Sequence, residues 1–167
     1  MCGILVVHKD NVDSFDLDII AHRGPNHSSK IISNDYIFGF VRLSIVDTSS
    51  NGHQPFINKH GISVTNGEIY NHKELMKQVD YEFVSKSDCE VLLPLLEKYS
   101  TNLFNMIDGE FATVMFDNKT NQLIAARDHL GIRPLFYGYD LNGNIAFCSE
   151  MKGLESMKDI RPFPPGH

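Results

Sequence analysis

Short apolar stretches separated by polar turns dominate the chain. Their length and their content of β-branched and aromatic residues predict β-strands. The predicted strands cover residues 3–7, 36–41, 62–65, 110–116, 123–127, 135–139 and 145–148. In the second half of the chain, turn-rich segments such as DNKTNQ and DLNGN separate these stretches and favour antiparallel hairpins. The C-terminal half is therefore predicted to form a β-meander.

Helical periodicity is clearest after Ser87. The apolar residues that share one helical face there are Val91, Leu92, Leu95, Leu96 and Tyr99. Ser87 and Glu90 fit an S-x-x-E capping box at the start of this helix. Pro94 removes a backbone donor, which predicts a kink near Glu90. Further helices are predicted over residues 14–21, 71–79 and 150–156.

The elements together indicate one α+β domain with sheets covered by helices. A chain of 167 residues is long enough to bury a substantial core as one domain. Its 42% hydrophobic and 22% charged residues are typical of folded globular proteins. We expect the domain to cover residues 1–160. The proline-rich segment RPFPPGH, residues 161–167, is predicted to be an inter-domain connector or tail.

Charge and cysteine content narrow the range of functions. Lys+Arg number 15 against Asp+Glu 21, without a basic cluster, so nucleic acid is not expected as a partner. No stretch is long enough to span a bilayer, and no basic segment precedes the short apolar opening, so neither membrane insertion nor export is expected. Three cysteines without C-x-x-C spacing favour reduced thiols in the cytoplasm and no metal site.

Cys2 is a candidate nucleophile because of its position. Removal of Met1 is expected before so small a residue, and it would leave a free α-amine beside the thiol. An α-amine has a pKa of about 7.7 to 8.0, so it can take the thiol proton near neutral pH and return it to a leaving group. Such activation of a weak nucleophile is well known. The alternative is that Cys2 is simply a small residue at the start of a strand.

The segment NGEIYN, residues 66–71, offers hydrogen-bond donors at the end of a predicted strand. Asn66 carries a side-chain amide, and Gly67 has no side chain to keep its backbone N–H from a ligand. Together they could form an oxyanion hole. Taken alone, Asn-Gly also favours a tight turn.

Arg42 and Asp88 could bind the two charged groups of an amino acid. Arg42 lies in the apolar context VRLSIVD, which suits a bidentate contact with an α-carboxylate. Asp88 lies in the first turn of a predicted helix, where it could accept hydrogen bonds from an α-ammonium group. The alternatives are a surface ion pair for Arg42 and an interaction with the helix dipole for Asp88.

A series of motifs in a fixed order gives a specific resemblance. The motifs are MCGI, HRGPN, VRLSIVD, GHQPF, NGEIYN, SDCEVLL, IDGEF, ARDHLGIRPLFY, FCSEMKGL and FPPGH. With them, nearly the whole chain resembles the class II glutamine amidotransferase domain, and more closely the N-terminal domain of glutamine-hydrolysing asparagine synthetases. The resemblance implies the four-layer αββα sandwich of N-terminal-nucleophile (Ntn) hydrolases, in which helices flank two stacked antiparallel sheets.

The resemblance also implies a role for each candidate residue. The implied roles are nucleophile for Cys2, oxyanion hole for Asn66 and Gly67, binding of the glutamine α-carboxylate for Arg42, binding of the α-amine for Glu68 and Asp88, and a pocket lining formed by the backbone of Leu43, Ser44, Ile45 and Val46. The implied reaction is attack of the thiol on the glutamine δ-carboxamide, loss of ammonia, and hydrolysis of a γ-glutamyl thioester.

No metal or cofactor is implied for this chain itself. ATP and Mg²⁺ would belong to a synthetase domain, supplied in cis or in trans, whose Ser-Gly-Gly-x-Asp-Ser-type loop does not occur here. Two positions depart from the family pattern, because Asn26 stands where Asp is common and Cys89 where Thr is common. Neither replaces a group with an implied catalytic role, and Cys89 is interpreted as a small apolar filler, as is Cys148.

The remaining motif with conspicuous charges, ARDHLGIRPLFY, is interpreted as structural. The side chains expected to pack on the sheet are Leu130, Ile132, Leu135 and Phe136, and Gly131 with Pro134 would shape a turn. Two alternative functions stay open at this point. One is a glutamine-binding module without turnover, and the other is an amidotransferase that acts on phosphoribosyl or hexose phosphates.

Overall fold

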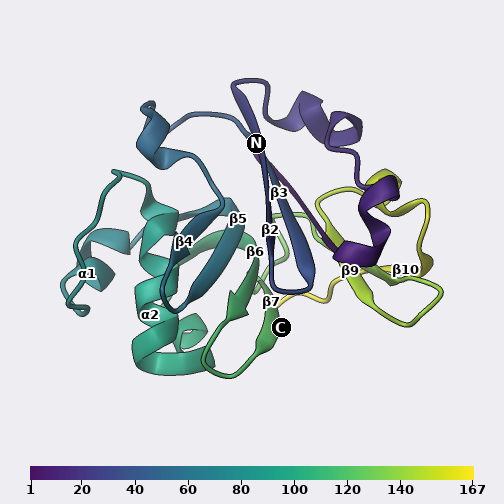
Figure 1. The fold of residues 1–167 in the computed structure, drawn as a ribbon. Coiled ribbons are helices and arrows are strands. Elements are labelled where there is room, and N and C mark those ends of the chain that lie inside the picture. Colours follow the sequence, from purple (N-terminus) through teal and green to yellow (C-terminus); the bar gives the residue numbers. More distant parts are fainter.

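The computed structural model describes residues 1–167 and contains two antiparallel β-sheets (Figure 1). The strands of the six-stranded sheet are, in spatial order, β10 (Lys158–Pro162), β8 (Phe136–Tyr139), β9 (Ile145–Cys148), β1 (Gly3–His8), β3 (Tyr36–Arg42) and β2 (His27–Ser33). The strands of the four-stranded sheet are β4 (Phe56–Asn58), β5 (Gly61–Ile69), β6 (Gly109–Asp117) and β7 (Gln122–Arg127).

Helices cover the outer faces of both sheets. The two α-helices, α1 (His72–Met76) and α2 (Leu92–Tyr99), lie beside the four-stranded sheet (Figure 1). The other helices are 3₁₀ turns: η1 (Lys9–Ser14), η2 (Asp18–Arg23), η3 (Ser50–Gly52), η4 (Asp88–Val91), η5 (Ser100–Asn105) and η6 (Met151–Leu154). None of these helices combines the length and the apolar character needed to cross a membrane.

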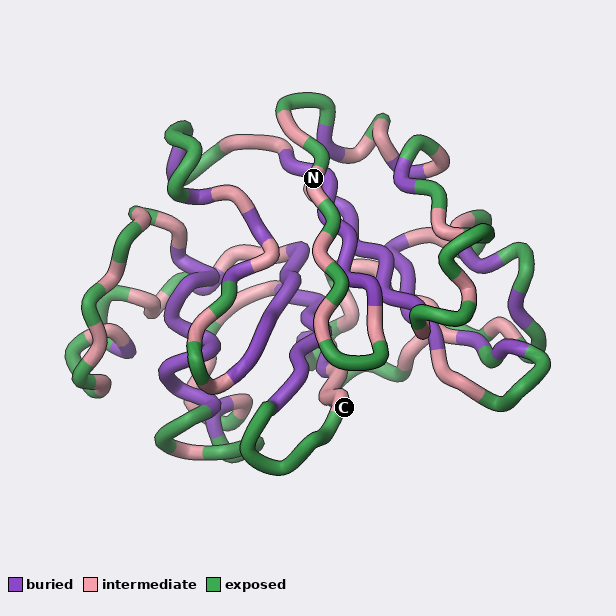
Figure 2. The backbone as a smooth tube through the Cα atoms, in the orientation of Figure 1, coloured by how far each residue is buried: buried purple, intermediate pink, exposed green.

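The central strands are buried on both faces, which produces a four-layer structure. In β1, Ile4 and Val6 pack between the two sheets, whereas Leu5 and Val7 pack against η2 and η6. Successive side chains of a strand point to opposite faces, so one strand can contribute to two cores. Figure 2 shows the resulting buried centre with exposed loops around it. A third core joins α2 to the four-stranded sheet, and the predicted αββα sandwich is confirmed.

The strand predictions hold for the interior of the sheets and fail at three of the four sheet edges. Each predicted strand overlaps an observed one, and only the strand predicted at residues 135–139 begins one residue later, at Phe136. The sequence missed β2, β4 and β10, all of which are edge strands. Edge strands face solvent and often carry polar residues, so they lack the continuous apolar run of a doubly buried strand.

The helix predicted after Ser87 is two elements, and its predicted cap is wrong. The 3₁₀ helix η4 runs directly into α2, and Pro94 is the third residue of α2, two residues after the change of helix type. Ser87 makes no side-chain cap bond. The Glu90 carboxylate instead accepts hydrogen bonds from the N–H groups of Val84 at 2.9 Å and Ser85 at 2.8 Å, which orders the loop before η4.

The other predicted helices are shorter than expected. The segment 71–79 forms only α1, and the segments 14–21 and 150–156 contain parts of η1 and η2 and all of η6. Short 3₁₀ turns are common as connectors, and tertiary contacts decide how far such segments continue. One layer of the sandwich is therefore made of 3₁₀ turns.

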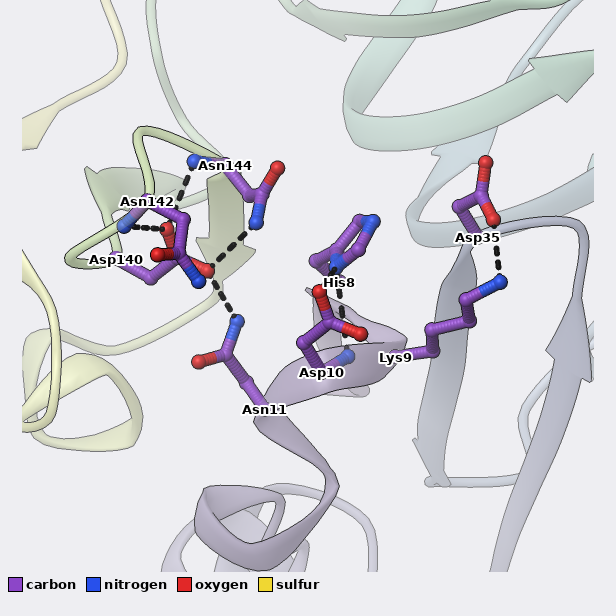
Figure 3. Close-up of polar contacts among 8 residues, drawn as sticks. All are labelled: His8, Lys9, Asp10, Asn11, Asp35, Asp140, Asn142 and Asn144. Atoms are coloured by element: carbon purple, nitrogen blue, oxygen red, sulfur yellow. Dashed lines mark hydrogen bonds and ion pairs between the residues drawn. The ribbon is translucent and has the colours of Figure 1, made fainter.

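A buried carboxylate ties η1 to the hairpin between β8 and β9 (Figure 3). Asp140 accepts a hydrogen bond from Asn11 Nδ2 at 2.7 Å, and it also accepts bonds from the backbone N–H groups of Asn142 and Asn144, each at 2.8 Å. These bonds, with that of Asn11 the largest, hold the pKa of Asp140 well below its ordinary value. The carboxylate thus stays charged and stabilises this end of the six-stranded sheet.

The residues after β10 contact the body of the domain. Phe163 packs against the core between the sheets. The Arg127 N–H donates to the His167 carbonyl at 2.8 Å, and the Gly166 N–H donates to the Asp128 carbonyl at 3.0 Å. Of the predicted tail, residues 161–162 therefore belong to β10, and residues 163–167 are ordered by core packing and by hydrogen bonds with the chain around β7. Their predicted role as a connector between domains stays a prediction.

Candidate functional site

A pocket lies where β1, β3 and β5 approach η4. Its lining residues are Cys2, Phe40, Arg42, Leu43, Ile45, Val46, Asp47, Gly52, Gln54, Thr65, Gly67, Glu68, Ser87, Asp88, Cys89 and Arg133. The structure thus brings together all the candidate residues from the sequence except Ser44 and Asn66. Ser44 lies beside the pocket, where its N–H donates to the Asn26 side chain at 2.9 Å.

Cys2 lies directly before β1 and is partly buried. Its Sγ donates to the Leu43 carbonyl at 3.5 Å and accepts from the Leu43 N–H at 3.4 Å. The Arg23 Nε donates to the Cys2 carbonyl at 2.9 Å. Met1 is 55% exposed, so the bond between Met1 and Cys2 is accessible for cleavage. Leu43 therefore holds the thiol at the pocket wall, and Arg23 holds the Cys2 backbone.

Arg42 ends β3 with its side chain buried in the pocket wall. The guanidinium donates to the Ser49 carbonyl at 2.7 Å and also to the Asp47 carbonyl. It forms no ion pair with a carboxylate, so the alternative of a surface pair is wrong. A buried cation whose hydrogen-bond partners are neutral carbonyl groups can still attract an anion in the pocket.

Asp47 ties the loop after β3 to the segment before η4. Its carboxylate accepts hydrogen bonds from the Ser49 hydroxyl, the Ser49 N–H and the Lys86 N–H, each at 2.7 Å. These bonds, with that of the Ser49 hydroxyl the largest, lower the pKa of Asp47 from 3.8 to about 2. The sequence analysis gave Asp47 no role, although the Asp-Thr-Ser pattern that follows VRLSIV is typical of a carboxylate that caps its own turn.

Asp47 predicts a pH-dependent contribution to stability. Its folded pKa of about 2 lies below the unfolded value, so its stabilisation is present above about pH 4 and is lost as the pH falls through 2. We expect Asp47→Asn to lower the unfolding free energy by about 1 to 2 kcal/mol at pH 7 and by much less at pH 2.5. Urea unfolding at both pH values measures this difference. The control is Asp80→Asn, which changes an exposed carboxylate. If Asp47→Asn lowered the unfolding free energy equally at both pH values, the prediction would be contradicted.

The C-terminal end of β5 places Gly67 and Glu68 in the pocket. A Cβ atom on Gly67 would lie 2.4 Å from the Glu110 carbonyl oxygen of β6, so only glycine fits there. Asn66 is 1% exposed, and its Nδ2 has no hydrogen-bond partner although it is buried. The tight-turn alternative for Asn-Gly is wrong, because both residues lie inside a strand. The structure therefore places an unpaired amide next to the one glycine that lines the pocket from β5.

Asp88 and Cys89 form the pocket wall at the start of η4. The Asp88 Oδ2 accepts a hydrogen bond from the Ile69 N–H at 2.6 Å, and the Cys89 Sγ lies 3.6 Å from the same oxygen. Burial, followed by the charge of Asp88, raises the pKa of Cys89 well above its ordinary value. Cys89 therefore stays a neutral thiol, which is a poor nucleophile.

Two further polar residues of the pocket were missed by the sequence analysis. Gln54 bonds both backbone groups of Thr65, accepting from its N–H at 2.7 Å and donating to its carbonyl at 3.0 Å. Arg133 forms an ion pair with Glu110, and its Nε is buried without a partner. Both residues lie inside the motifs GHQPF and ARDHLGIRPLFY. Their positions inside motifs of the family were the available signal.

The structural interpretation of ARDHLGIRPLFY is only partly right. Leu135 is fully buried and Phe136 packs on the six-stranded sheet, as predicted. Leu130 and Ile132 do not pack, since they are 80% and 52% exposed. Gly131 has a φ of +65°, which agrees with the predicted turn. The apolar residues of this loop are exposed because the Asp128 carboxylate holds the loop through backbone N–H groups.

Comparison with solved structures defines the fold class as that of Ntn-type amidotransferases. The chain superimposes on glutamine phosphoribosylpyrophosphate amidotransferase from B. subtilis with a TM-score of 0.80 and 19% identity, over 99% of this chain and 46% of that chain. A second solved structure, described as the allosteric regulatory enzyme of purine biosynthesis, gives a TM-score of 0.77 at 19% identity over the same shares. At this identity the likeness shows the fold alone.

The chain belongs to the glutamine amidotransferase domain family, whose pattern matches residues 1–163. It is 40% identical to a glutamine-hydrolyzing asparagine synthetase of Sandersonia aurantiaca, over all of this chain and 34% of that protein. It is 42% identical to asparagine synthetase 3 of Arabidopsis thaliana, over all of this chain and 31% of that protein. The chain thus spans about a third of the length of these relatives. The family predicted from the motifs is confirmed.

Proposed function

We propose that this chain is the glutaminase half of an asparagine-synthetase-like amidotransferase. It would release ammonia and glutamate from L-glutamine through a γ-glutamyl thioester on Cys2. The observation that carries this proposal is that Cys2, the cation Arg42 and the carboxylate Asp88 line one pocket. A thiol between opposite charges suits an amino-acid substrate with a reactive side chain.

The charged groups of the pocket suit the two ends of a zwitterion. Arg42 would bind the α-carboxylate, because its buried guanidinium has no carboxylate partner. Asp88 and Glu68 would accept hydrogen bonds from the α-ammonium group. The loop after β3 would close one wall, and its contributions are the backbone of Leu43, Ser44, Ile45 and Val46. Glutamine held in this way would extend its amide towards Cys2.

The reaction would use both functional groups of Cys2 after Met1 is removed. The thiol proton passes to the α-amine as sulfur attacks the amide carbon, so that a C–S bond forms. The proton then passes to the leaving nitrogen, the C–N bond breaks, and ammonia departs. Water adds to the thioester, which releases glutamate and restores the thiol. The Gly67 N–H and the Asn66 Nδ2 would stabilise the oxyanion that forms in both steps.

The ammonia would pass to a synthetase domain, in cis or in trans, that uses ATP and Mg²⁺. The relatives of about 40% identity are asparagine synthetases, which favours an asparagine-type acceptor. The phosphoribosylpyrophosphate amidotransferase shares the fold at only 19% identity, so a phosphoribosyl acceptor has less support. No cofactor would be needed in this chain. Three cysteines without a disulfide support a cytoplasmic location.

The test combines a mass measurement with an assay of amide hydrolysis. Intact mass of the purified protein should show that Met1 is absent. L-glutamine should give equal amounts of glutamate and ammonia, whereas D-glutamine and L-asparagine should give neither. The glutamine analogue 6-diazo-5-oxo-L-norleucine should label the Cys2 peptide. Retained Met1 together with glutamine binding but no glutamate would support the binding module without turnover and would overturn the proposal.

A further inference from the structure

Glu150 lies at the centre of a cluster of basic side chains just before η6. Its Oε1 accepts hydrogen bonds from Arg23 Nη1 at 3.0 Å and His22 Nε2 at 2.8 Å, and its Oε2 lies 3.2 Å from Lys152 Nζ. The Arg23 side chain is only 8% exposed, and that of Glu150 is 23% exposed. Glu150 belongs to the motif FCSEMKGL, to which neither the sequence analysis nor the proposed reaction gives a role. The cluster lies outside the pocket lining.

The Arg23 guanidinium connects this cluster to Cys2. Its Nε donates to the Cys2 carbonyl at 2.9 Å, while its Nη1 is held by Glu150. Because a guanidinium is planar and rigid, a bond at one nitrogen restricts where the others can point. Glu150 is therefore one side chain away from the backbone of the nucleophile.

Contacts of the neighbouring backbone show that this region anchors the start of β1. The Ser149 N–H donates to the Ile4 carbonyl at 3.0 Å, and the Ser149 hydroxyl accepts from the Ile4 N–H at 3.0 Å. These bonds do not involve the Glu150 side chain. A substitution of Glu150 can therefore loosen Arg23 without releasing the strand that follows Cys2.

We propose that Glu150 is a positioning residue for the Cys2 nucleophile. Its carboxylate holds Arg23, and Arg23 holds the Cys2 carbonyl. The α-amine, the carbonyl carbon and the thiol-bearing CH₂ are all attached to one carbon atom. Fixing the carbonyl therefore fixes the directions in which the base and the sulfur point. A misplacement of reacting atoms by about 1 Å can cost a factor of roughly 100 in rate.

The charge of Glu150 is maintained near neutral pH by its partners. Burial by itself would raise the pKa of Glu150, but hydrogen bonds from Arg23, His22 and Lys152 lower it below its ordinary value. A charged acceptor makes the stronger hydrogen bond to a guanidinium. The carboxylate can therefore hold Arg23 across the pH range in which the α-amine of Cys2 works as a base.

This inference rests on the proposed glutaminase activity, so its test uses the same assay. We expect Glu150→Ala to lower kcat for glutamine hydrolysis by roughly tenfold or more, because Cys2 loses its fixed direction. The KM for glutamine should stay within about twofold, because Arg42 and Asp88 do not contact this cluster. Glu150→Gln keeps an oxygen that can accept from Arg23 and should restore most of kcat. Lys152→Met is the matched control, since it removes a partner of the same carboxylate that contacts neither Arg23 nor Cys2.

Thermal unfolding of each variant separates positioning from folding. Should Glu150→Ala fail to fold, Glu150→Asp takes its place, because the shorter carboxylate withdraws from Arg23 and should lose kcat as alanine does. An unchanged kcat in Glu150→Asp or Glu150→Ala, or a loss confined to KM, would overturn the inference. Cys2→Ala is assayed in parallel. If the wild-type protein hydrolyses glutamine no faster than Cys2→Ala, both the proposed function and this inference are overturned. If the wild-type protein is active and Glu150→Ala is equally active, only the inference is overturned.

Discussion

Cys2→Ala is expected to reduce glutamate release from L-glutamine by at least about a thousandfold, to the level of the uncatalysed background. The substitution removes the only atom placed to form the covalent bond with the amide carbon. The remaining pocket can still bind glutamine through Arg42 and Asp88. We therefore expect glutamine to protect Cys2→Ala against thermal unfolding as it protects the wild type.

Cys148→Ala provides the matched control for Cys2→Ala. Cys148 is fully buried at the end of β9 and does not line the pocket. Its loss should leave kcat within about twofold and lower the melting temperature, because it leaves a small cavity. Glutamate release by Cys2→Ala at the wild-type rate would rule out the nucleophile. A coupled glutamate dehydrogenase assay measures both variants.

Asn66→Ala is expected to lower kcat by about 100-fold to 1,000-fold, which is the usual cost of losing one oxyanion-hole donor. The Asn66 Nδ2 is buried without a hydrogen-bond partner in the unliganded protein. An unpaired buried donor costs folding free energy. Its removal should therefore leave stability equal or higher while the transition state loses a hydrogen bond. Because the donor contacts the oxyanion rather than the bound substrate, KM should change little.

Ser63→Ala tests whether any unpaired polar atom in β5 has this effect. Ser63 lies on the same strand, is fully buried, and has an Oγ without a partner. It does not line the pocket, so its loss should leave kcat unchanged. Steady-state kinetics and urea unfolding of both variants complete the test. A kcat for Asn66→Ala within threefold of wild type would exclude the oxyanion role, and it would agree with the absence of Asn66 from the pocket lining.

Local patterns along the chain predicted the interior strands well. Strands such as β1 and β6 are buried on both faces, so a continuous apolar run marks each of them in the sequence. The edge strand β2 alternates between exposed and partly buried residues and gives no such run. The capping box at Ser87 failed for a different reason. Glu90 has stronger partners in the loop at residues 84–85, and tertiary hydrogen bonds override a local preference.

The site could be predicted only as far as chemistry and motif point to single residues. Cys2, Arg42 and Asp88 were found because each residue type suits a definite part of an amino-acid substrate. Asp47 and Gln54 were missed because their side chains bond backbone groups of other segments. Those partners lie 39 and 11 residues away. No periodicity or spacing reports such contacts.

The sequence by itself determined the interior strands, the family with its two-sheet class of fold, and Cys2 as the candidate nucleophile. Apolar runs mark the buried strands, the ordered motifs specify the family and its fold, and a thiol and an amine on one residue are joined covalently. Only the tertiary structure decided where this nucleophile points. Glu150 binds Arg23, 127 residues away in the sequence, and Arg23 donates to the Cys2 carbonyl, while the amide of Asn66 is buried without a partner. Contacts between distant segments depend on how the layers pack, which local preferences along the chain do not encode.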